Sequence, residues 1–405
     1  MERLPFCGLS SEHWSNLATA ATLLICVLYG GWIVGGGLAQ GWGVDYVHFW
    51  SGAKVILNGG NPYHGLYPHP LLPVGECFHP LLWVALLFVP LACLPFEIGI
   101  RVWFGLNAVM LGSALWLLAW KLWPPQSGWQ RYLILAYAMW LGVPVLTTAQ
   151  LAGVMLLALC LAVWAMRSEH FFISGLLLTF LLLKPWVVVF VFPAIFVAGL
   201  RMKRMSVIAG FLNGATLWVG LSAIVLPGWW WDLIRLDLSQ AVQHVEEGVL
   251  VLYPPVTLRT WLESVWHVPT KVAVVVYVCS LGLLCVLAGW VFWRYWQRRL
   301  GLPALLAGTI ALSLLGTPYV REHDYVLWCL PLFVIWTMRQ ALPTRWTGWG
   351  LAAAMVAAVL LRALGGLLPW SYNTALLLGA MTLYMLARQV ALSSKGIEID
   401  AGWTV

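Results

Sequence analysis

Long apolar runs that few charges interrupt constrain this chain more than any other feature of its sequence. Hydrophobic residues make up 62% of the 405 residues and charged residues only 9%, and the mean hydropathy is +0.86. A soluble domain carries charge on about a quarter of its residues. Because an apolar run of about 20 residues can cross a bilayer as a helix, the sequence predicts an all-α polytopic membrane protein.

About twelve runs qualify as candidate membrane-spanning helices. The first has no small-residue cleavage pattern before Gln40, so we expect it to be retained rather than removed as a signal peptide. We treat residues 1–405 as a single membrane-embedded domain. The candidate spans are residues 16–39, 80–96, 98–120, 131–147, 150–166, 171–200, 206–227, 269–293, 302–316, 325–338, 347–368 and 374–391.

The basic residues predict the orientation of these spans, because cytoplasmic links carry an excess of Lys and Arg. With both termini cytoplasmic, all the main clusters lie inside: Arg201, Lys203 and Arg204; Arg294, Arg298 and Arg299; Arg339 and Arg345; Arg388 and Lys395. Three segments rich in ionisable residues then lie outside, at 40–79, 228–268 and 316–324. The short links 121–131 and 167–170 also fall outside. We therefore expect any chemistry at the extracytoplasmic face of the cytoplasmic membrane.

Several classes of site are not expected from this sequence. The eight cysteines are scattered and form no Cys-x-x-Cys pair, so neither a metal cage nor a disulfide framework is predicted. No glycine-rich phosphate loop or dinucleotide fingerprint occurs, and we expect no cofactor. The chain has no separate basic domain, which argues against a nucleic-acid partner.

The first outer segment contains "GVDYVHFWSGAKVILNGGNPYHGLY", residues 43–67. Its apolar residues recur at helical spacing and predict an amphipathic helix that lies on the outer leaflet. Asp45 precedes this pattern and His48 follows one turn later on the same side. Asp45 is an N-cap in one interpretation and a catalytic base in the other, and the two are compatible because a base must be ionised and held rigidly.

Further candidates lie in the later segments. Lys184 is in the middle of the run 171–200, where a charge is costly, and is either a partner in a buried ion pair or a contact for a substrate. Arg321, His323 and Asp324 precede the span 325–338, as a polar helix cap or as a phosphate site. In the segment 228–268, which we expect to determine acceptor specificity, Arg259 is a candidate phosphate partner.

Five segments resemble, in order, the conserved blocks of glycosyltransferase family 87, and the resemblance covers residues 17–390. It implies a C-type membrane glycosyltransferase that moves a sugar, with inversion, from a polyprenyl-phosphate donor such as polyprenyl phosphate mannose to a lipid or glycan acceptor. Asp45 matches the outer-loop aspartate of the family and is the implied base. The block expected to read Gly-Gln is here Ala149-Gln150, and Gln150 is a candidate substrate contact. The segments are "DYVHFWSGAKVILNGGNPY", "FHPLLWVALLFVPLACLP", "QLAGVMLLALCLAVW", "GLLLTFLLLKPW" and "TPYVREHDYVLWCLP".

Alternatives remain open at this point. The same architecture could transfer another lipid-linked sugar, such as a pentose or an aminosugar, or ligate a glycan. A noncatalytic assembly partner is a further alternative. A lipid or glycan transporter would place charges in several central helices, whereas Lys184 is almost alone in this chain.

Overall fold

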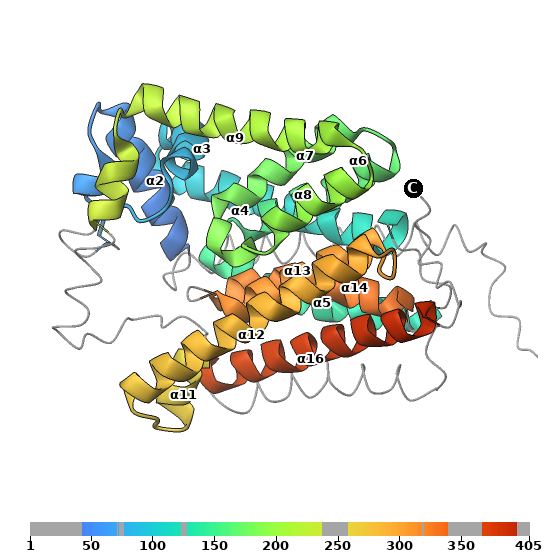
Figure 1. The fold of residues 1–405 in the computed structure, drawn as a ribbon. Helices are drawn as coiled ribbons and strands as arrows, with labels where there is room; N and C mark the ends of the chain where they lie inside the picture. The colour runs from blue at the N-terminus through green and yellow to red at the C-terminus, as the bar shows by residue number, and fades with distance from the viewer. Residues whose placement is uncertain are drawn as a thin grey trace, which may run out of the picture.

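A computed structural model describes residues 43–70, 72, 77–122, 128–236, 258–317, 320–338 and 367–394 of the chain. Within these ranges every regular element is a helix, as Figure 1 shows, and this confirms the all-α prediction. The predicted span 16–39, most of the span 347–368, both termini and residues 237–257 lie outside the described ranges.

The elements follow one another along the chain in three groups. The first group is α2 (Val44–Leu57), η3 (Pro62–His64), α3 (Leu82–Ala92), α4 (Phe96–Trp116), η4 (Leu117–Leu122), α5 (Gly128–Thr148) and α6 (Ala152–Arg167). The second is α7 (Phe171–Leu178), η5 (Thr179–Leu183), η6 (Pro185–Val188), α8 (Val191–Arg201) and α9 (Met205–Val225). The third is α11 (Leu258–Val265), α12 (Thr270–Trp296), α13 (Leu302–Gly316), η7 (Glu322–Trp328), α14 (Cys329–Met338) and α16 (Leu367–Ser393).

Three helices in the described part of the chain are long and apolar enough to cross a membrane. They are Phe96–Leu122, Met205–Val225 and Thr270–Trp296, and they coincide with the predicted spans 98–120, 206–227 and 269–293. Several shorter apolar helices, among them α3, α6, α8 and α13, have 10–17 residues. The structure therefore supports a membrane protein, while the count of twelve spans stays a prediction.

Helix α3 differs from the predicted span 80–96. Its 11 residues rise about 16 Å, roughly half the thickness of a hydrocarbon core. At its start, Trp83 packs edge-to-face on Trp229, with 5.4 Å between the ring centroids, and at its end Ala92 accepts a hydrogen bond from Lys54 on α2. Both ends of α3 thus lie beside residues of the segments 40–79 and 228–268, and α4 starts from the same end of the molecule as α2.

The apolar run 171–200 is not one helix but a hairpin broken at Lys184. Lys184 has φ −142° and ψ 74°, and Pro185 starts a new 3₁₀ turn, because a proline disfavours helical backbone at the residue before it. Helices α7 and α9 are parallel, since Gly210 of α9 lies beside Phe172 and Gly214 lies beside Thr179. Helix α8 must therefore return to the end at which α7 begins.

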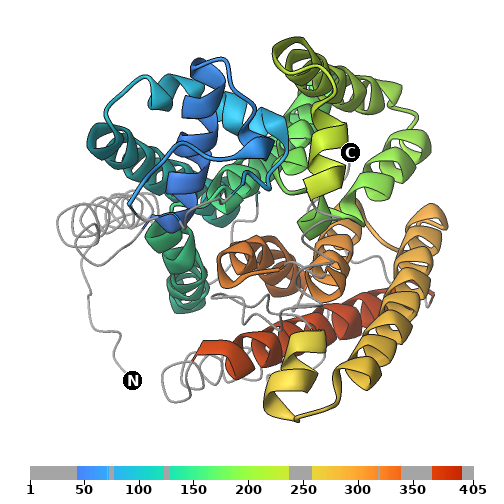
Figure 2. The same ribbon diagram turned by 90° about the vertical axis from the view of Figure 1, so that its left-hand side faces the viewer.

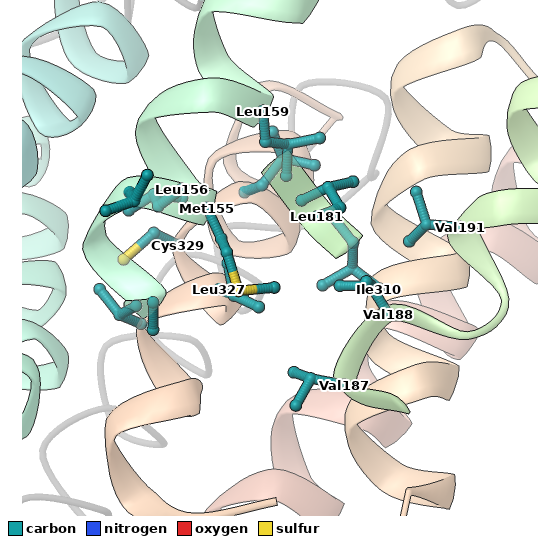
Figure 3. Packing of buried hydrophobic residues seen from close by; sticks show 14 of the residues in the cluster. Met155, Leu156, Leu159, Leu181, Val187, Val188, Val191, Ile310, Leu327 and Cys329 are labelled. Carbon is teal, nitrogen blue, oxygen red and sulfur yellow. The ribbon is translucent and has the colours of Figure 1, made fainter. Parts of the chain in front are cut away.

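Polar partners satisfy the irregular backbone of this hairpin, as burial at membrane depth requires. The Leu182 carbonyl accepts a hydrogen bond from the Trp83 indole N–H at 3.0 Å, and the Phe190 N–H donates to the Ser313 hydroxyl at 3.0 Å. Around the break, Figure 3 shows buried side chains of η5, η6 and α8 packed against those of α6, α13 and η7. The helix break therefore lies within the buried core, and the packing around it holds the backbone of Lys184 in place.

The hairpin and the short α3 bring the basic links to one end of the molecule. Arg167 donates to the Lys121 carbonyl at 3.2 Å, and the Arg204 guanidinium lies 4.7 Å from the Phe171 ring centre. Arg201 donates to the Leu300 carbonyl at 3.3 Å. The links that begin at Lys121 and Arg167 were expected on the side opposite residues 201–204, but they lie at the same end. We call this the basic end, and the end that carries α2, seen from the front in Figure 2, the α2 end.

Glycines allow α7 and α9 to pack with their backbones in contact, and this predicts a specific sensitivity. A Cβ at Gly210 would overlap the Phe172 carbonyl oxygen. We expect Gly210→Ala to lower the free energy of unfolding by about 1–3 kcal/mol, because backbone must move to accept the methyl group. Gly220, also on α9, has no neighbouring atom within 4 Å of such a Cβ and provides the control Gly220→Ala. Equal thermal unfolding midpoints in detergent for the two variants would contradict the close packing.

Candidate active site

Helix α2 positions the first two candidate residues at the α2 end. Gly43 precedes the helix in the left-handed region, with φ 88°, and its N–H donates to the Thr147 carbonyl at 2.9 Å. Asp45 therefore lies inside the first helical turn, and its side chain does not cap the helix, contrary to the N-cap interpretation. Among the described residues nothing donates a hydrogen bond to this half-buried carboxylate, so its oxygens are open to a substrate hydroxyl.

His48 lies at a meeting point of three charged or titratable side chains. Burial lowers its pKa below 6.5, the Asp45 carboxylate opposes this shift, and His79 and Arg321 add to it. These electrostatic effects require proximity, so the first outer segment and the residues before η7 converge on His48. The sequence did not single out His79, although it occurs in the block "FHPLLW" that closes the first outer segment.

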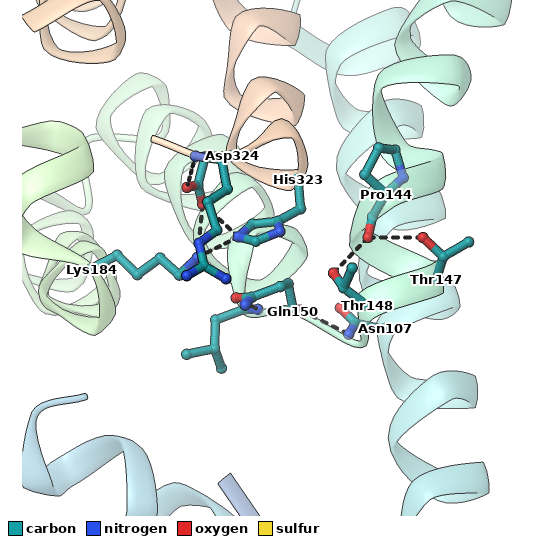
Figure 4. A network of polar contacts seen from close by, with 10 residues as sticks. Asn107, Pro144, Thr147, Thr148, Gln150, Lys184, His323 and Asp324 are labelled. Carbon is teal, nitrogen blue, oxygen red and sulfur yellow. Dashed lines mark hydrogen bonds and ion pairs between the residues drawn. The ribbon is translucent and has the colours of Figure 1, made fainter. Parts of the chain in front are cut away.

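A buried ion pair forms a second part of the site, shown in Figure 4. The Lys184 ammonium donates to Asp324 Oδ1 and to His323 Nε2, each at 2.9 Å. The Lys184 and Asp324 side chains are 11% and 1% exposed. Because an ammonium only donates, His323 accepts at Nε2 and is neutral, with its proton on Nδ1. Burial, followed by the Lys184 and Arg321 charges, holds the pKa of His323 well below 6.5.

Arg321 connects the two parts of the site. Its N–H donates to Asp324 Oδ2 at 3.1 Å, and its carbonyl accepts from the Asp324 N–H at 2.9 Å, so the start of η7 is fixed by reciprocal hydrogen bonds. Its charge acts on both His48 and His323. No ion pair engages the Arg321 guanidinium among the residues that the structure describes. Arg321 is thus a cation available to an anionic ligand, whereas Lys184 is already paired.

Gln150 belongs to the turn that joins α5 to α6. Ala149 has φ 58°, a backbone conformation that favours glycine, the residue expected at this position from the resemblance. On α4, Trp103 donates to the Ala149 carbonyl at 2.7 Å and Asn107 donates to the Gln150 carbonyl at 2.9 Å. In Figure 4 the Gln150 side chain lies beside Lys184 and His323. The structure therefore brings Gln150 to the site despite the alanine.

A further polar contact joins the first and second outer segments. Asn61 donates to Asp232 Oδ2 at 2.8 Å and accepts from the Tyr63 N–H at 3.0 Å, which shapes the Asn-Pro-Tyr turn. The His64 ring lies 3.7 Å from the same carboxylate. Asp232 was not a sequence candidate, because its partner is 171 residues away and no local pattern indicates it.

Arg259 is the one candidate that the structure separates from this site. It lies on α11, which packs against α12 and α16, and it forms an exposed i, i+4 ion pair with Glu263 at 3.0 Å. Figures 1 and 2 both show α11 apart from α2. An exposed helix pair of this kind contributes little to stability, roughly 0.3–0.5 kcal/mol.

Taken together, the site offers the Asp45 carboxylate, the Arg321 guanidinium, which has no ion pair among the described residues, and a buried Lys–Asp pair beside a neutral histidine. In the described residues no group of three or more His, Cys, Asp or Glu side chains could hold a metal ion. A carboxylate accepts a proton and cations stabilise a departing phosphate, so the arrangement is suited to group transfer from a phosphate.

The lowered pKa values predict how stability depends on pH. As pH falls below 6.5, the unfolded chain takes up protons on His48 and His323 before the folded chain does. The folded state therefore keeps its full free energy of unfolding above pH 6.5. It loses the part that depends on these two neutral histidines as the pH falls towards their folded-state pKa values. We expect His323→Gln to flatten the decrease in unfolding midpoint between pH 6.5 and about pH 5. If the unfolding midpoint of His323→Gln fell with pH as steeply as that of the wild type and of the exposed control His267→Gln, the lowered pKa of His323 would be contradicted.

Comparison with known proteins identifies a family. The sequence model described as Glycosyltransferase family 87 matches residues 82–318, more than half of the chain. No curated protein and no solved structure matches the chain significantly. The matched range includes Gln150 and Lys184, while Asp45 precedes it and Arg321 follows it. The match supports a membrane glycosyltransferase, and the contribution of α2 and η7 to its site rests on geometry.

Proposed function

Since this chain belongs to glycosyltransferase family 87, we propose that it transfers mannose from a polyprenyl-phosphate donor to a lipid or glycan acceptor. The observation that carries this proposal is the convergence of Asp45, His48 and Arg321, which combines a proton acceptor with a cation that has no ion pair among the described residues. A lipid phosphate needs such a cation when it leaves, and an attacking hydroxyl needs such an acceptor.

The transfer is a single displacement with inversion. The acceptor hydroxyl oxygen forms a bond to the anomeric carbon while the bond from that carbon to the donor phosphate oxygen breaks. Asp45 accepts the hydroxyl proton, and the polyprenyl phosphate leaves with the electron pair. General-base catalysis of this kind contributes about 10²- to 10⁴-fold to a rate.

The remaining residues support these two events. Arg321 neutralises the phosphate that departs, and His323 can donate from Nδ1 to one of its oxygens. The Lys184–Asp324 pair fixes His323 and the start of η7, so that the cation of Arg321 stays in place. His48 is uncharged near neutral pH and adjoins Asp45, where it can contact a sugar or acceptor hydroxyl without adding charge. Gln150 is positioned for the same task beside Lys184.

The distribution of charge supports an extracytoplasmic site. Lys and Arg residues of four links gather at the basic end, which the positive-inside rule assigns to the cytoplasm. The candidate site lies toward the other end, beside α2. A donor with a lipid anchor suits such a site, because its lipid keeps it at the membrane surface.

A panel of labelled donors tests the choice of substrate. Purified full-length protein in liposomes is offered polyprenyl phosphate linked to mannose, to a pentose or to an aminosugar, together with a lipid extract as acceptor. We expect labelled product from the mannose donor. If only another donor gave product, that sugar would replace mannose in the proposal and the proposed active site would stand. Movement of intact lipid across the bilayer without sugar transfer would favour a transporter.

A further inference from the structure

The basic end carries a second cluster of functional groups, remote from the candidate active site. Six cations lie on the links α8–α9 and α12–α13, which touch through the hydrogen bond from Arg201 to the Leu300 carbonyl. We call these residues the basic cluster: Arg201, Lys203, Arg204, Arg294, Arg298 and Arg299. None of them forms an ion pair with a described carboxylate, and Glu169, the described acid at this end, is unpaired as well.

Three of these arginines lie over aromatic rings. The guanidinium carbon lies 3.9 Å from the ring centre of Tyr295 for Arg201, 4.7 Å from that of Phe171 for Arg204, and 6.0 Å from that of Trp290 for Arg294. Arg201 already donates to the Leu300 carbonyl and Arg294 to Gln297, and each guanidinium, which has five N–H donors, keeps others for an anion. The side chains are thereby ordered before a ligand binds, which reduces the entropy lost on binding.

One donor in the cluster indicates an anion directly. The Nε atom of Arg294 is buried and has no hydrogen-bond partner among the described residues, while its Nη1 donates to Gln297 at 3.2 Å. A buried donor without a partner is costly, and an acceptor oxygen would remove that cost. Unpaired cations beside an orphaned donor match the chemistry of a phosphate group.

The surroundings indicate that this phosphate belongs to a lipid. Trp293 and Trp296 flank Arg294 on the last turn of α12 and are 58% and 53% exposed. Exposed tryptophans at the end of a membrane helix lie at the level of the lipid headgroups. Leu200 and Met205, beside the other link, are also exposed and apolar. We propose that the basic cluster binds the headgroup phosphate of an anionic phospholipid on the cytoplasmic leaflet, independently of the sugar-transfer site.

Lipid binding by the full-length protein in detergent tests this proposal. Native mass spectrometry measures the Kd for phosphatidylglycerol and for phosphatidylcholine. Each cation near a membrane surface adds roughly a fivefold factor, so we expect Arg201→Gln/Arg204→Gln/Arg294→Gln to weaken phosphatidylglycerol binding about a hundredfold. The charge-matched control removes three exposed cations at the α2 end, Arg101→Gln/Arg235→Gln/Lys271→Gln, and should bind like the wild type.

A charge-conserving variant distinguishes a binding site of defined geometry from nonspecific electrostatic attraction of the lipid. Arg201→Lys/Arg204→Lys/Arg294→Lys keeps the charge but loses the planar guanidinium and its fixed N–H donors, and we expect about tenfold weaker binding. Unchanged affinity in this variant, or equal losses in the Gln variant and the control, would overturn the proposal. Displacement of the lipid by inorganic phosphate at the same concentration would also overturn it, because the ligand would then be a free anion.

Discussion

Replacing either partner of the Lys184–Asp324 ion pair is expected to destabilise the protein by about 3–5 kcal/mol. Both side chains are buried, and the ammonium and the carboxylate are 2.9 Å apart. Lys184→Met leaves the Asp324 carboxylate without its counter-charge, and Asp324→Asn leaves the ammonium in an apolar core. Thermal or denaturant unfolding in detergent measures both losses.

A double variant distinguishes a true pair from two separate contributions. Removing both charges in Lys184→Met/Asp324→Asn leaves no unpaired ion, and the asparagine oxygen can still accept from the Arg321 N–H. We expect the double variant to be no less stable than either single variant, so that the losses are strongly non-additive. Additive losses would contradict the pairing. A stable double variant that keeps sugar transfer would show that the pair is structural and that Lys184 does not serve the substrate, which decides between its two interpretations.

Replacing Asp45 by Asn is expected to lower the rate of sugar transfer by about 10²- to 10⁴-fold. Asparagine keeps the size of the side chain and its place in the first turn of α2, but it cannot accept the proton of the acceptor hydroxyl. Because Asp45 forms no described hydrogen bond, the unfolding midpoint should change little. The loss should therefore appear in kcat at saturating donor and acceptor.

Two comparisons make the Asp45 experiment specific. Glu97→Gln removes an exposed carboxylate at the same end of the molecule and should leave transfer unchanged. Asp45→Glu keeps the base but moves it by one methylene, and it should retain more activity than Asp45→Asn. If Glu97→Gln and Asp45→Asn reduced the rate equally, the effect would be one of surface charge rather than of proton transfer.

The sequence was sufficient for the residues whose roles are local. The apolar runs predicted α4, α9 and α12, which are long and apolar enough to cross a membrane. The helical spacing after Asp45 predicted α2, and the density of charge identified residues 321–324. The residues alone did not predict that these segments converge, because the electrostatic interaction between Arg321 and His48 joins positions more than 250 residues apart.

The errors have physical causes as well. Residues 171–200 form a continuous apolar run, and only Lys184-Pro185 indicates the break that turns it into a hairpin. The apolar run 80–96 passes through the turn at Cys93–Pro95, which makes α3 appear longer than it is. The sequence predicted one membrane crossing for residues 80–96 and one for residues 171–200, and the structure has neither. Because the two surplus crossings offset each other, the predicted orientation of the segments after residue 200 is unchanged. Asp232 and His79 were missed because their partners are set by tertiary packing.

The most direct test of this account measures transfer from radiolabelled polyprenyl phosphate mannose by purified protein in liposomes. Wild type and Asp45→Asn are assayed side by side with a membrane lipid extract as acceptor. We expect a labelled glycolipid or glycan from the wild type and, from the variant, a rate at least about a hundredfold lower. Equal rates from the two proteins would contradict the assignment of Asp45 as the base and, with it, the proposed site beside α2.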